Sequence, residues 1–386
     1  MFNLQKAIQR ELSLFVDAIS LDGGSIPEVS KVAFCKARKK LKPEAFIELS
    51  EVILEEYYKS SEYTKWKGYR LLGVDGSTVE LPNSEEIQEH FGVFKTRNDG
   101  KVTCMGRTEM IYDTLNHMTI QGKLSSIEKS ETEILWEMLS EFKPGRNDLM
   151  IFDRYYASQL LFLYLNHRKI NFCFRMKKDW WKIVEEFNKT GLDSQVIDIE
   201  LPLKYDEKAN ELGIRNKKIK VRLVKIELET GETEILLTSL LNSTKYSNED
   251  LSDLYSKRWP IEESYKTFKH KVCIENFTGK SLKSVQQDFF IKIFIMNLTA
   301  AAINPINDAL KKKSSKVKYD KQVNVIEAIA TFKRAVVSFF LMKKIKSGLK
   351  RLFDRFSRIL EPIRPDRKFE RNKQPKRKYH MNYKPV

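Results

Sequence analysis

The spacing of apolar and polar residues divides the chain into a helical beginning, a mixed middle and a helical end. Up to about residue 65, apolar residues recur at helical spacing, with Pro43 as a break. From about residue 69 the pattern changes to short apolar runs bounded by Gly, Asn and Asp, which is typical of strands. The predicted elements of this part are strands in YRLLGVDGSTVELP, VTCMGRTEMIYDTL and HMTIQGKL, a helix over 131–142 and a strand over 149–152.

Further along, Ser158 is the predicted N-cap of a helix that runs through His167, and INFCFRM is the next predicted strand. Strands that alternate with helices predict a mixed α/β sheet. Between residues 179 and 245 the rhythm changes, because KIKVRLVKIELETGETEILLTSL predicts an antiparallel hairpin around a Thr-Gly turn. Helical spacing returns from residue 248 to about 352 and includes FFIKIFIMNLTAAAI, which we interpret as a buried helix rather than a membrane span.

These patterns predict five regions. They are a helical N-terminal region that contacts DNA (1–66), the first part of a mixed α/β core (67–178), a β-rich insertion (179–246), the second part of the core with a helical C-terminal region (247–352), and a basic tail (353–386) that is extended after Pro362. The DNA contact of the first region is inferred from its Lys and Arg cluster at 36–42. A solvated helix face packed on the core explains that cluster equally well.

The positive net charge of the chain indicates which kind of partner it binds. The formal net charge is +17 and the isoelectric point is near 9.4, and residues 343–386 alone hold 16 Lys or Arg against four acids. A polyanion is therefore expected as a partner, and nucleic acid is the commonest one. The four cysteines are widely separated, without metal-site spacing, and the first residues lack a signal-peptide pattern, so we expect a soluble, cytoplasmic protein.

The stretch YSKRWPIEESYKTFK carries the most specific pattern of polar residues. On one ideal helix, Tyr255, Arg258, Glu262 and Lys269 fall within about 60° of one another, a face that suits a phosphate backbone and a metal ion. Pro260 allows a division into two helical segments, with Tyr255 and Arg258 on the first. Apolar residues of the same stretch recur at helical spacing and should be buried: Ile261, Tyr265, Phe268 and Val272.

Two aspartates complete a set of carboxylates. Asp75 lies in LLGVDGST, where an Asp-Gly hairpin turn is the simpler interpretation, and Asp153 directly follows an apolar strand. Glu262 has Glu263 beside it as an equally acidic candidate. Three carboxylates brought together would repel one another without a cation, and hard divalent ions such as Mg²⁺ or Mn²⁺ prefer such oxygen ligands. Two ions about 4 Å apart would suit an in-line phosphoryl displacement.

These residues resemble those of a known family. The signature Y-(2)-R-(3)-E-(6)-K, without any departure, is similar to that of the DDE transposases of the insertion-sequence-four family, and VDGST and FDRYYAS resemble its two aspartate motifs. Asp153 follows Asp75 by 78 residues, and Glu262 follows Asp153 by 109. The resemblance covers roughly residues 25 to 300. It implies a ribonuclease-H-like mixed sheet flanked by helices, with a β-rich insertion before the last catalytic helix and a small helical N-terminal region.

Carried over by position, the resemblance implies that Asp75, Asp153 and Glu262 bind two Mg²⁺ ions, with Mn²⁺ as an alternative. It also implies that three residues contact phosphates of the transposon end: Tyr255, Arg258 and Lys269. Arg154 and Trp259 are weaker candidates for DNA contact. Trp180 and Trp181 suit either stacking on a flipped base or ordinary packing at a domain edge.

The function implied is that of an insertion-sequence transposase that binds terminal inverted repeats of double-stranded DNA, cleaves a strand and joins it to a target. We expect a homodimer that bridges two ends, acting at the nucleoid without a membrane. Three alternatives remain: a metal-dependent nuclease of the same core, an inactive DNA-binding derivative, and a basic RNA-binding or ribosome-associated protein. The five histidines show no pairing that indicates a nucleophile or a metal site.

Overall fold

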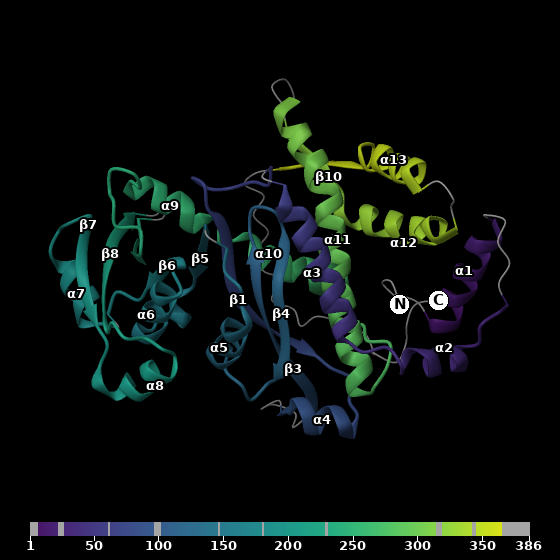
Figure 1. Ribbon diagram of the computed structural model, residues 1–386, viewed down its shortest axis with the longest axis horizontal. Helices are drawn as coiled ribbons and strands as arrows, with labels where there is room; N and C mark the ends of the chain where they lie inside the picture. The colour runs from purple at the N-terminus through teal and green to yellow at the C-terminus, as the bar shows by residue number, and fades with distance from the viewer. Residues whose placement is uncertain are drawn as a thin grey trace.

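One mixed sheet organises the computed structural model of the chain (Figure 1). The structure describes residues 7–21, 27–60, 62–95, 102–145, 147–179, 181–227, 231–313, 319–341 and 345–364. The strands of the large sheet are β1 (Arg70–Glu80), β2 (Val93–Lys95), β3 (Val102–Asp113), β4 (Met118–Ser126), β5 (Asp148–Phe152), β6 (Asn171–Met176), β7 (Ser194–Glu200), β8 (Lys218–Glu227) and β9 (Thr233–Thr238).

The centre of this sheet has the order β4-β3-β1-β5-β6. Strands β4, β3 and β1 pair antiparallel, whereas β5 and β6 run parallel to β1. An antiparallel meander continued by two parallel strands, with helices in the crossover connections, is the ribonuclease-H-like arrangement. The predicted fold class is confirmed.

The insertion is continuous with this sheet. Strand β9 pairs antiparallel with β6, β8 with β9, and β7 with β8, so three further strands extend the edge that β6 would otherwise leave open. The predicted β8–β9 hairpin is confirmed, although its turn partly lies outside the described residues. The insertion also contains two short helices, α7 (Lys182–Lys189) and α8 (Asp206–Glu211).

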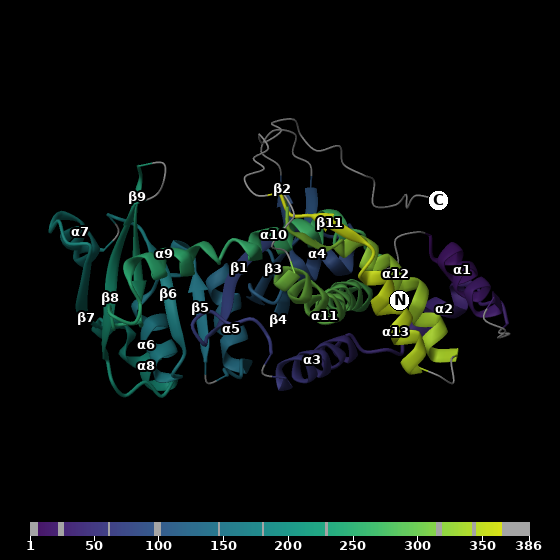
Figure 2. The same ribbon diagram turned by 90° about the horizontal axis from the view of Figure 1, so that it is seen from above.

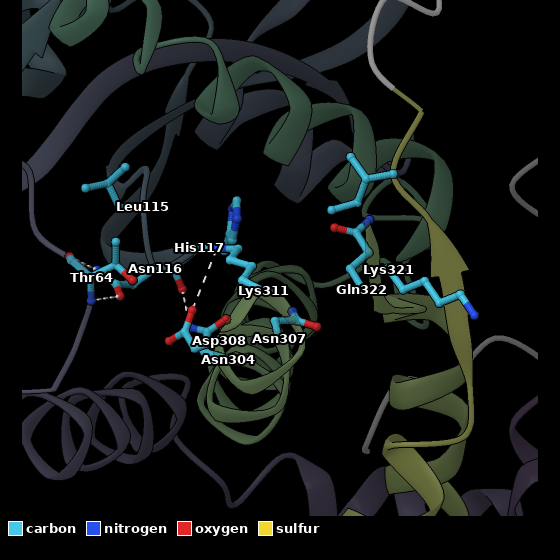
Figure 3. A pocket seen from close by; sticks show the side chains of 11 residues that line it. Thr64, Leu115, Asn116, His117, Asn304, Asn307, Asp308, Lys311, Lys321 and Gln322 are labelled. Carbon is cyan, nitrogen blue, oxygen red and sulfur yellow. Dashed lines mark hydrogen bonds and ion pairs between the residues drawn. The ribbon is translucent and has the colours of Figure 1, made fainter. Parts of the chain in front are cut away.

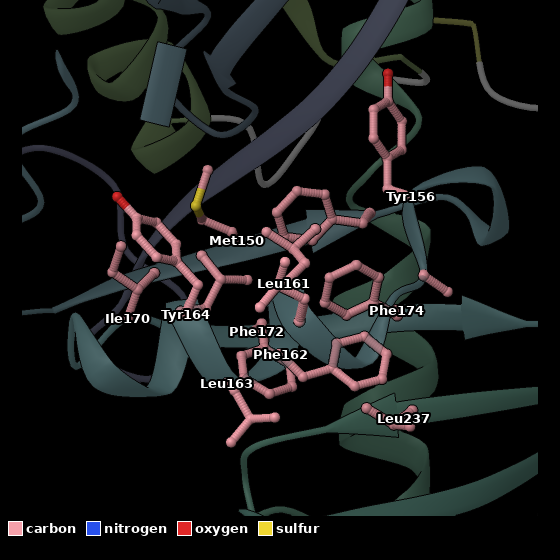
Figure 4. Packing of buried hydrophobic residues seen from close by; sticks show 14 of the residues in the cluster. Met150, Tyr156, Leu161, Phe162, Leu163, Tyr164, Ile170, Phe172, Phe174 and Leu237 are labelled. Atoms are coloured by element: carbon pink, nitrogen blue, oxygen red, sulfur yellow. The ribbon is translucent and has the colours of Figure 1, made fainter. Parts of the chain in front are cut away.

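Helices cover both faces of the sheet (Figure 2). One face packs on α5 (Glu131–Glu141) and α6 (Gln159–His167), where aromatic and aliphatic side chains from both layers form the largest buried cluster (Figure 4). Ser158 caps α6 as predicted, since its hydroxyl accepts a hydrogen bond from the backbone N–H of Leu161 at 3.1 Å. The other face packs on α9 (Asn248–Ser256) and α10 (Pro260–Lys266).

Strand alternation decides which residues meet which helices. On β1, Leu72 and Val74 join the α5–α6 cluster, whereas Leu71 packs with the buried leucines of α9. Because successive side chains point to opposite faces, Asp75 lies on the face covered by α9 and α10. The same alternation on β5 places Asp153, the residue after Phe152, on that face as well.

A long helix, α11 (Leu282–Lys313), packs against β4 and against α3 (Glu44–Lys59). By length and composition it is a candidate membrane span, but 67% of its most apolar window is buried within the protein. We interpret it as a core helix, in agreement with the expectation for FFIKIFIMNLTAAAI. Lys292, on the same helix, is buried and donates to the carbonyl oxygens of Cys273 (2.9 Å), Ile274 (3.1 Å) and Asn276 (3.1 Å).

The two ends of the chain form one helical group (Figures 1 and 2). Its members are α1 (Ile8–Leu21), α2 (Lys31–Arg38), α12 (Val325–Leu341) and α13 (Ile345–Phe356). Lys333 of α12 pairs with Glu11 of α1 at 2.6 Å. Within the basic cluster at 36–42, Arg38 is buried and pairs with Asp288 at 2.8 Å, so it serves packing.

The remaining elements are short: α4 (Glu85–Phe91), β10 (Lys321–Val323) and β11 (Leu360–Pro362). Helix α13 runs across the boundary drawn at 352/353 between the core and the basic tail. Residues 365–386, which hold most of the predicted extended tail, lie outside the described residues.

Candidate active site

The backbone brings the two aspartates side by side. Strands β1 and β5 pair in parallel up to Val74 and Phe152, so Asp75 and Asp153 are the next residues along two adjacent strands. Both lie on the face covered by α9 and α10. The pairing therefore joins positions 78 residues apart in the chain.

Asp75 does not lie in a turn. Strand β1 runs through Asp75 and Gly76 and pairs with Met110 and Glu109 of β3, so the Asp-Gly hairpin interpretation is wrong. Gly76 is required here for space, because a Cβ at this position would lie 2.6 Å from the Oε2 of Glu109 and 2.6 Å from the carboxyl carbon of Glu131. The close approach of these two glutamates, from the neighbouring strand and helix, explains why glycine occupies this position, and no turn is needed.

The YSKRWPIEESYKTFK stretch is divided into more segments than predicted. Tyr255 is on α9, Arg258 lies in the turn that follows, Glu262 is on α10, and Lys269 lies in a π-helical turn, Thr267–Lys271. Pro260 occupies the first position of α10, where its missing N–H costs nothing. The prediction that the four polar residues share one continuous helical face is therefore wrong. The prediction of burial is confirmed for all four apolar residues of this stretch: Ile261, Tyr265, Phe268 and Val272.

Helix α10 lies close enough to β1 for Glu262 to influence Asp75. A Cβ at Gly73 would lie 3.5 Å from the side chain of Ile261, so this glycine admits the helix. Arg258 forms an ion pair with Glu262. Burial raises the pKa of Asp75 to about 7, Arg258 acts in the opposite direction, and the negative charge of Glu262 adds to the rise.

Asp153 is held by an arginine that sequence reasoning missed. Arg175 of β6 donates a hydrogen bond from Nε to Asp153 Oδ1 at 2.9 Å, and its Nη2 forms an ion pair with the same oxygen at 2.8 Å. Its Nη1 pairs with Glu234 of β9 at 2.8 Å. The hydroxyl of Tyr255 also donates to Asp153 Oδ1, at 3.4 Å. Burial raises the pKa of this tyrosine, although Arg258 and Arg175 oppose the rise, so its proton is retained for donation.

The other candidates for DNA contact differ in exposure. Lys269 donates to the hydroxyl of Ser77, two residues beyond Asp75, at 2.8 Å. Arg154 is exposed in the 3₁₀ turn after Asp153, and Trp259 is 54% exposed. Arg258, in contrast, is largely buried. Arg154 and Trp259 are therefore accessible to a ligand, whereas Arg258 and Lys269 already contact residues of the site.

Of the two tryptophans at the start of the insertion, only Trp181 is among the described residues. Trp181 packs against the α5–α6 cluster, with its ring centroid 5.5 Å from that of Phe162. Packing accounts for this residue. Trp180 lies outside the described residues.

A buried acid lies beneath the site, on the opposite face of β1. Glu109 is fully buried, accepts a hydrogen bond from the hydroxyl of Tyr156 at 2.7 Å, and has no hydrogen-bond partner at Oε2 among the described residues. Burial raises its pKa to about 9. Glu109 is therefore neutral near pH 7 and holds Tyr156, three residues beyond Asp153. A lone Glu within an alternating strand gave no signal for this role.

The oxygen donor set of Asp75, Asp153 and Glu262 fits a hard divalent cation in chemistry, and the pairing of β1 with β5 sets the two aspartates side by side. As the side chains stand, no three Asp, Glu, His or Cys residues in the described ranges are grouped closely enough to hold one ion. Two of the three carboxylates form ion pairs with arginines, Glu262 with Arg258 and Asp153 with Arg175. A metal ion would thus share these carboxylates with guanidinium groups.

A separate polar pocket lies where the β3–β4 turn meets the end of α11 and β10 (Figure 3). Asn304 donates to the carbonyl oxygen of Asn116 at 2.6 Å, and Lys311 pairs with Asp308 at 3.7 Å. None of the predicted site residues lines this pocket. Its polar groups hold the turn against the helix.

The family and sequence comparisons agree with the motif. The chain is 23% identical over 296 residues to the transposase InsG for insertion sequence element IS4 from Escherichia coli (strain K12), a match that covers 75% of this chain and 64% of that protein. The piggyBac transposase in a synaptic complex with hairpin DNA matches 74% of this chain and 57% of its own, with 10% identity and a TM-score of 0.40. Residues 66–298 match the model of the family described as Transposase DDE domain. The chain therefore belongs to the Transposase DDE domain family, and the resemblance to insertion-sequence-four transposases is confirmed.

Proposed function

We propose that this protein is the transposase of an insertion sequence, which binds the terminal inverted repeats of double-stranded DNA and catalyses metal-dependent strand cleavage and strand transfer. The observation that carries the proposal is the parallel pairing that sets Asp75 beside Asp153, with Glu262 within electrostatic reach of Asp75. Two Mg²⁺ ions, or Mn²⁺, would be held by these three carboxylates. Bound ions would activate a water or a 3′-hydroxyl and stabilise the leaving oxygen.

The other residues of the site orient these ligands and meet the DNA. Arg258 fixes the carboxylate of Glu262, and the Tyr255 hydroxyl fixes Asp153. Lys269 would bind a phosphate oxygen, and its hydrogen bond to Ser77, two residues beyond Asp75, supports this role. Two exposed side chains are offered to the nucleic acid, Arg154 for phosphate and Trp259 for stacking.

The whole protein acts, in this proposal, as a homodimer that bridges two transposon ends at the nucleoid of the cytoplasm. Its strong positive charge supplies much of the affinity for DNA. Binding should therefore weaken steeply as salt concentration rises, because phosphate contacts displace condensed counterions.

Single substitutions test the catalytic assignment. Asp75→Ala, Asp153→Ala and Glu262→Ala should each abolish cleavage of a labelled terminal repeat and leave DNA binding largely intact. Glu263→Ala is the matched control for Glu262, because Glu263 is more exposed and pairs with Lys266 instead. Cleavage at the normal rate by any of the first three variants would remove that residue from the site.

A strand-transfer assay separates transposition from simple hydrolysis. Labelled donor ends are incubated with a plasmid target, and a transposase yields joined product. Cleaved ends without joined product would identify a nuclease. Retention on duplex DNA compared with RNA tests the nature of the nucleic-acid partner.

A further inference from the structure

The insertion contributes a charged residue to the site, through Glu234 of β9. Strand β9 pairs with β6 so that Arg175 lies opposite Leu236, two residues beyond Glu234 on the same face. The Nη1 of Arg175 lies 2.8 Å from Glu234 Oε1, while its Nε and Nη2 contact Asp153. One guanidinium therefore bridges a residue of the insertion and a residue of the core site.

The contacts on Asp153 are unevenly divided between its two oxygens. The Nε and Nη2 of Arg175 and the hydroxyl of Tyr255 all contact Oδ1. None of these three contacts uses Oδ2. Arg175 thus fixes the rotamer of Asp153 and leaves its second oxygen for another ligand, which is the usual role of a hydrogen-bond partner behind a ligating carboxylate.

A guanidinium beside a cation site has an electrostatic cost, because its charge repels the incoming ion. We propose that Glu234 is a positioning residue of the metal site, which neutralises Arg175 so that this arginine can orient Asp153 without repelling the ion. This inference rests on the proposed function, since it assumes that Asp153 is a metal ligand. It gives the insertion a part in assembling the site, beyond any contact with DNA.

Glu234→Gln tests the proposal, because it removes the charge and retains the shape of the side chain. Mn²⁺ affinity is measured by electron paramagnetic resonance on the full chain without DNA. We expect binding to weaken about tenfold, the lower end of the effects seen for partners of metal ligands. Glu227→Gln, an exposed carboxylate at the end of β8 in the same hairpin, is the control and should bind Mn²⁺ as the unmodified chain does.

A double-mutant cycle separates the electrostatic role from a structural one. If Glu234 acts through Arg175, then Glu234→Gln should change Mn²⁺ affinity less than about twofold in an Arg175→Gln background. Unchanged affinity in the single variant, or the same loss in both backgrounds, would overturn the proposal. Thermal unfolding shows whether each variant is folded, and a merely structural role would lower stability without altering Mn²⁺ affinity.

Failure of the proposed function would look different. If the unmodified chain binds no Mn²⁺, or if Asp75→Asn binds it equally well, the metal site itself is wrong. Normal Mn²⁺ binding that Asp75→Asn abolishes and Glu234→Gln leaves unchanged rejects only the role of Glu234.

Discussion

Asp75→Asn should stabilise the protein in the absence of divalent ions, although it should abolish cleavage. Burial raises the pKa of Asp75 to about 7, against the favourable charge of Arg258 and with the repulsion of Glu262 and Glu131. At neutral pH and above, the folded state therefore holds an unfavourable carboxylate. Asparagine keeps the shape and removes that charge.

The size of the effect follows from the two pKa values. The ordinary value is 3.8, so the folded protein retains a proton that the unfolded chain has released between pH 3.8 and about 7. The free energy of unfolding contributed by Asp75 is fully present below pH 3.8 and falls by about 1.4 kcal/mol per pH unit until about pH 7. Asparagine does not titrate, so the free energy of unfolding of Asp75→Asn should exceed that of the unmodified chain by an amount that grows with pH, toward a limit of about 4 kcal/mol. Relaxation of the site around the charged carboxylate should reduce this difference to about 2 kcal/mol.

Urea unfolding in EDTA measures this difference at several pH values between about 5 and 8. Asp198→Asn on β7 is the control, because Asp198 is exposed and its removal should give no such trend. Adding Mg²⁺ should stabilise the unmodified protein and not Asp75→Asn, since binding of an ion to the folded state raises its stability. A stability difference between Asp75→Asn and the unmodified chain that stays constant with pH would refute the reasoning, as would a lower stability of the variant near pH 8.

Four further substitutions, at three positions, test buried polar contacts and close packing near the site and in the core. Glu109→Gln should leave the stability at pH 7 nearly unchanged, because burial keeps the pKa of Glu109 near 9 and its side chain is already neutral. Glu109→Leu should cost about 1–3 kcal/mol, because it leaves the Tyr156 hydroxyl without its acceptor. Urea unfolding measures both. Lys292→Met should cost about 3–5 kcal/mol, since three buried or part-buried hydrogen bonds to carbonyl oxygens lose their ammonium donor. A small loss of stability in thermal unfolding would contradict this. Gly76→Ala should cost about 1–3 kcal/mol and slow cleavage, because its Cβ would lie 2.6 Å from Glu109 Oε2 and from Glu131; unchanged stability would mean that these glutamates move aside.

Local sequence patterns predicted most individual elements but not how they join. The strands of the core and the β8–β9 hairpin follow from apolar runs bounded by turn residues, and the cap at Ser158 follows from its own side chain. The Asp75–Gly76 pair was ambiguous in the sequence, because a hairpin turn and a close approach of two glutamates both require glycine, and the structure excludes the turn. The continuation of the core sheet into the insertion was not predicted, since no local pattern says which strand edge a distant hairpin will meet. The segmented helix around Glu262 shows the same limit, because the π-helical turn depends on packing beyond the stretch itself.

The same distinction between local pattern and distant pairing applies to the site residues. A spaced signature identified Arg258. Arg175, in contrast, lies within β6, a strand of ordinary apolar character, and its role could be found only once β5, β6 and β9 were side by side. Yet the two arginines bear on one physical problem. A fold that gathers carboxylates for a metal must also form without it, and charges of the same sign would oppose folding. Arg258 compensates the charge of Glu262, Arg175 is shared between Asp153 and Glu234, and a raised pKa keeps Asp75 neutral up to about pH 7. The chain can thus fold before any ion arrives and still present oxygen ligands to it.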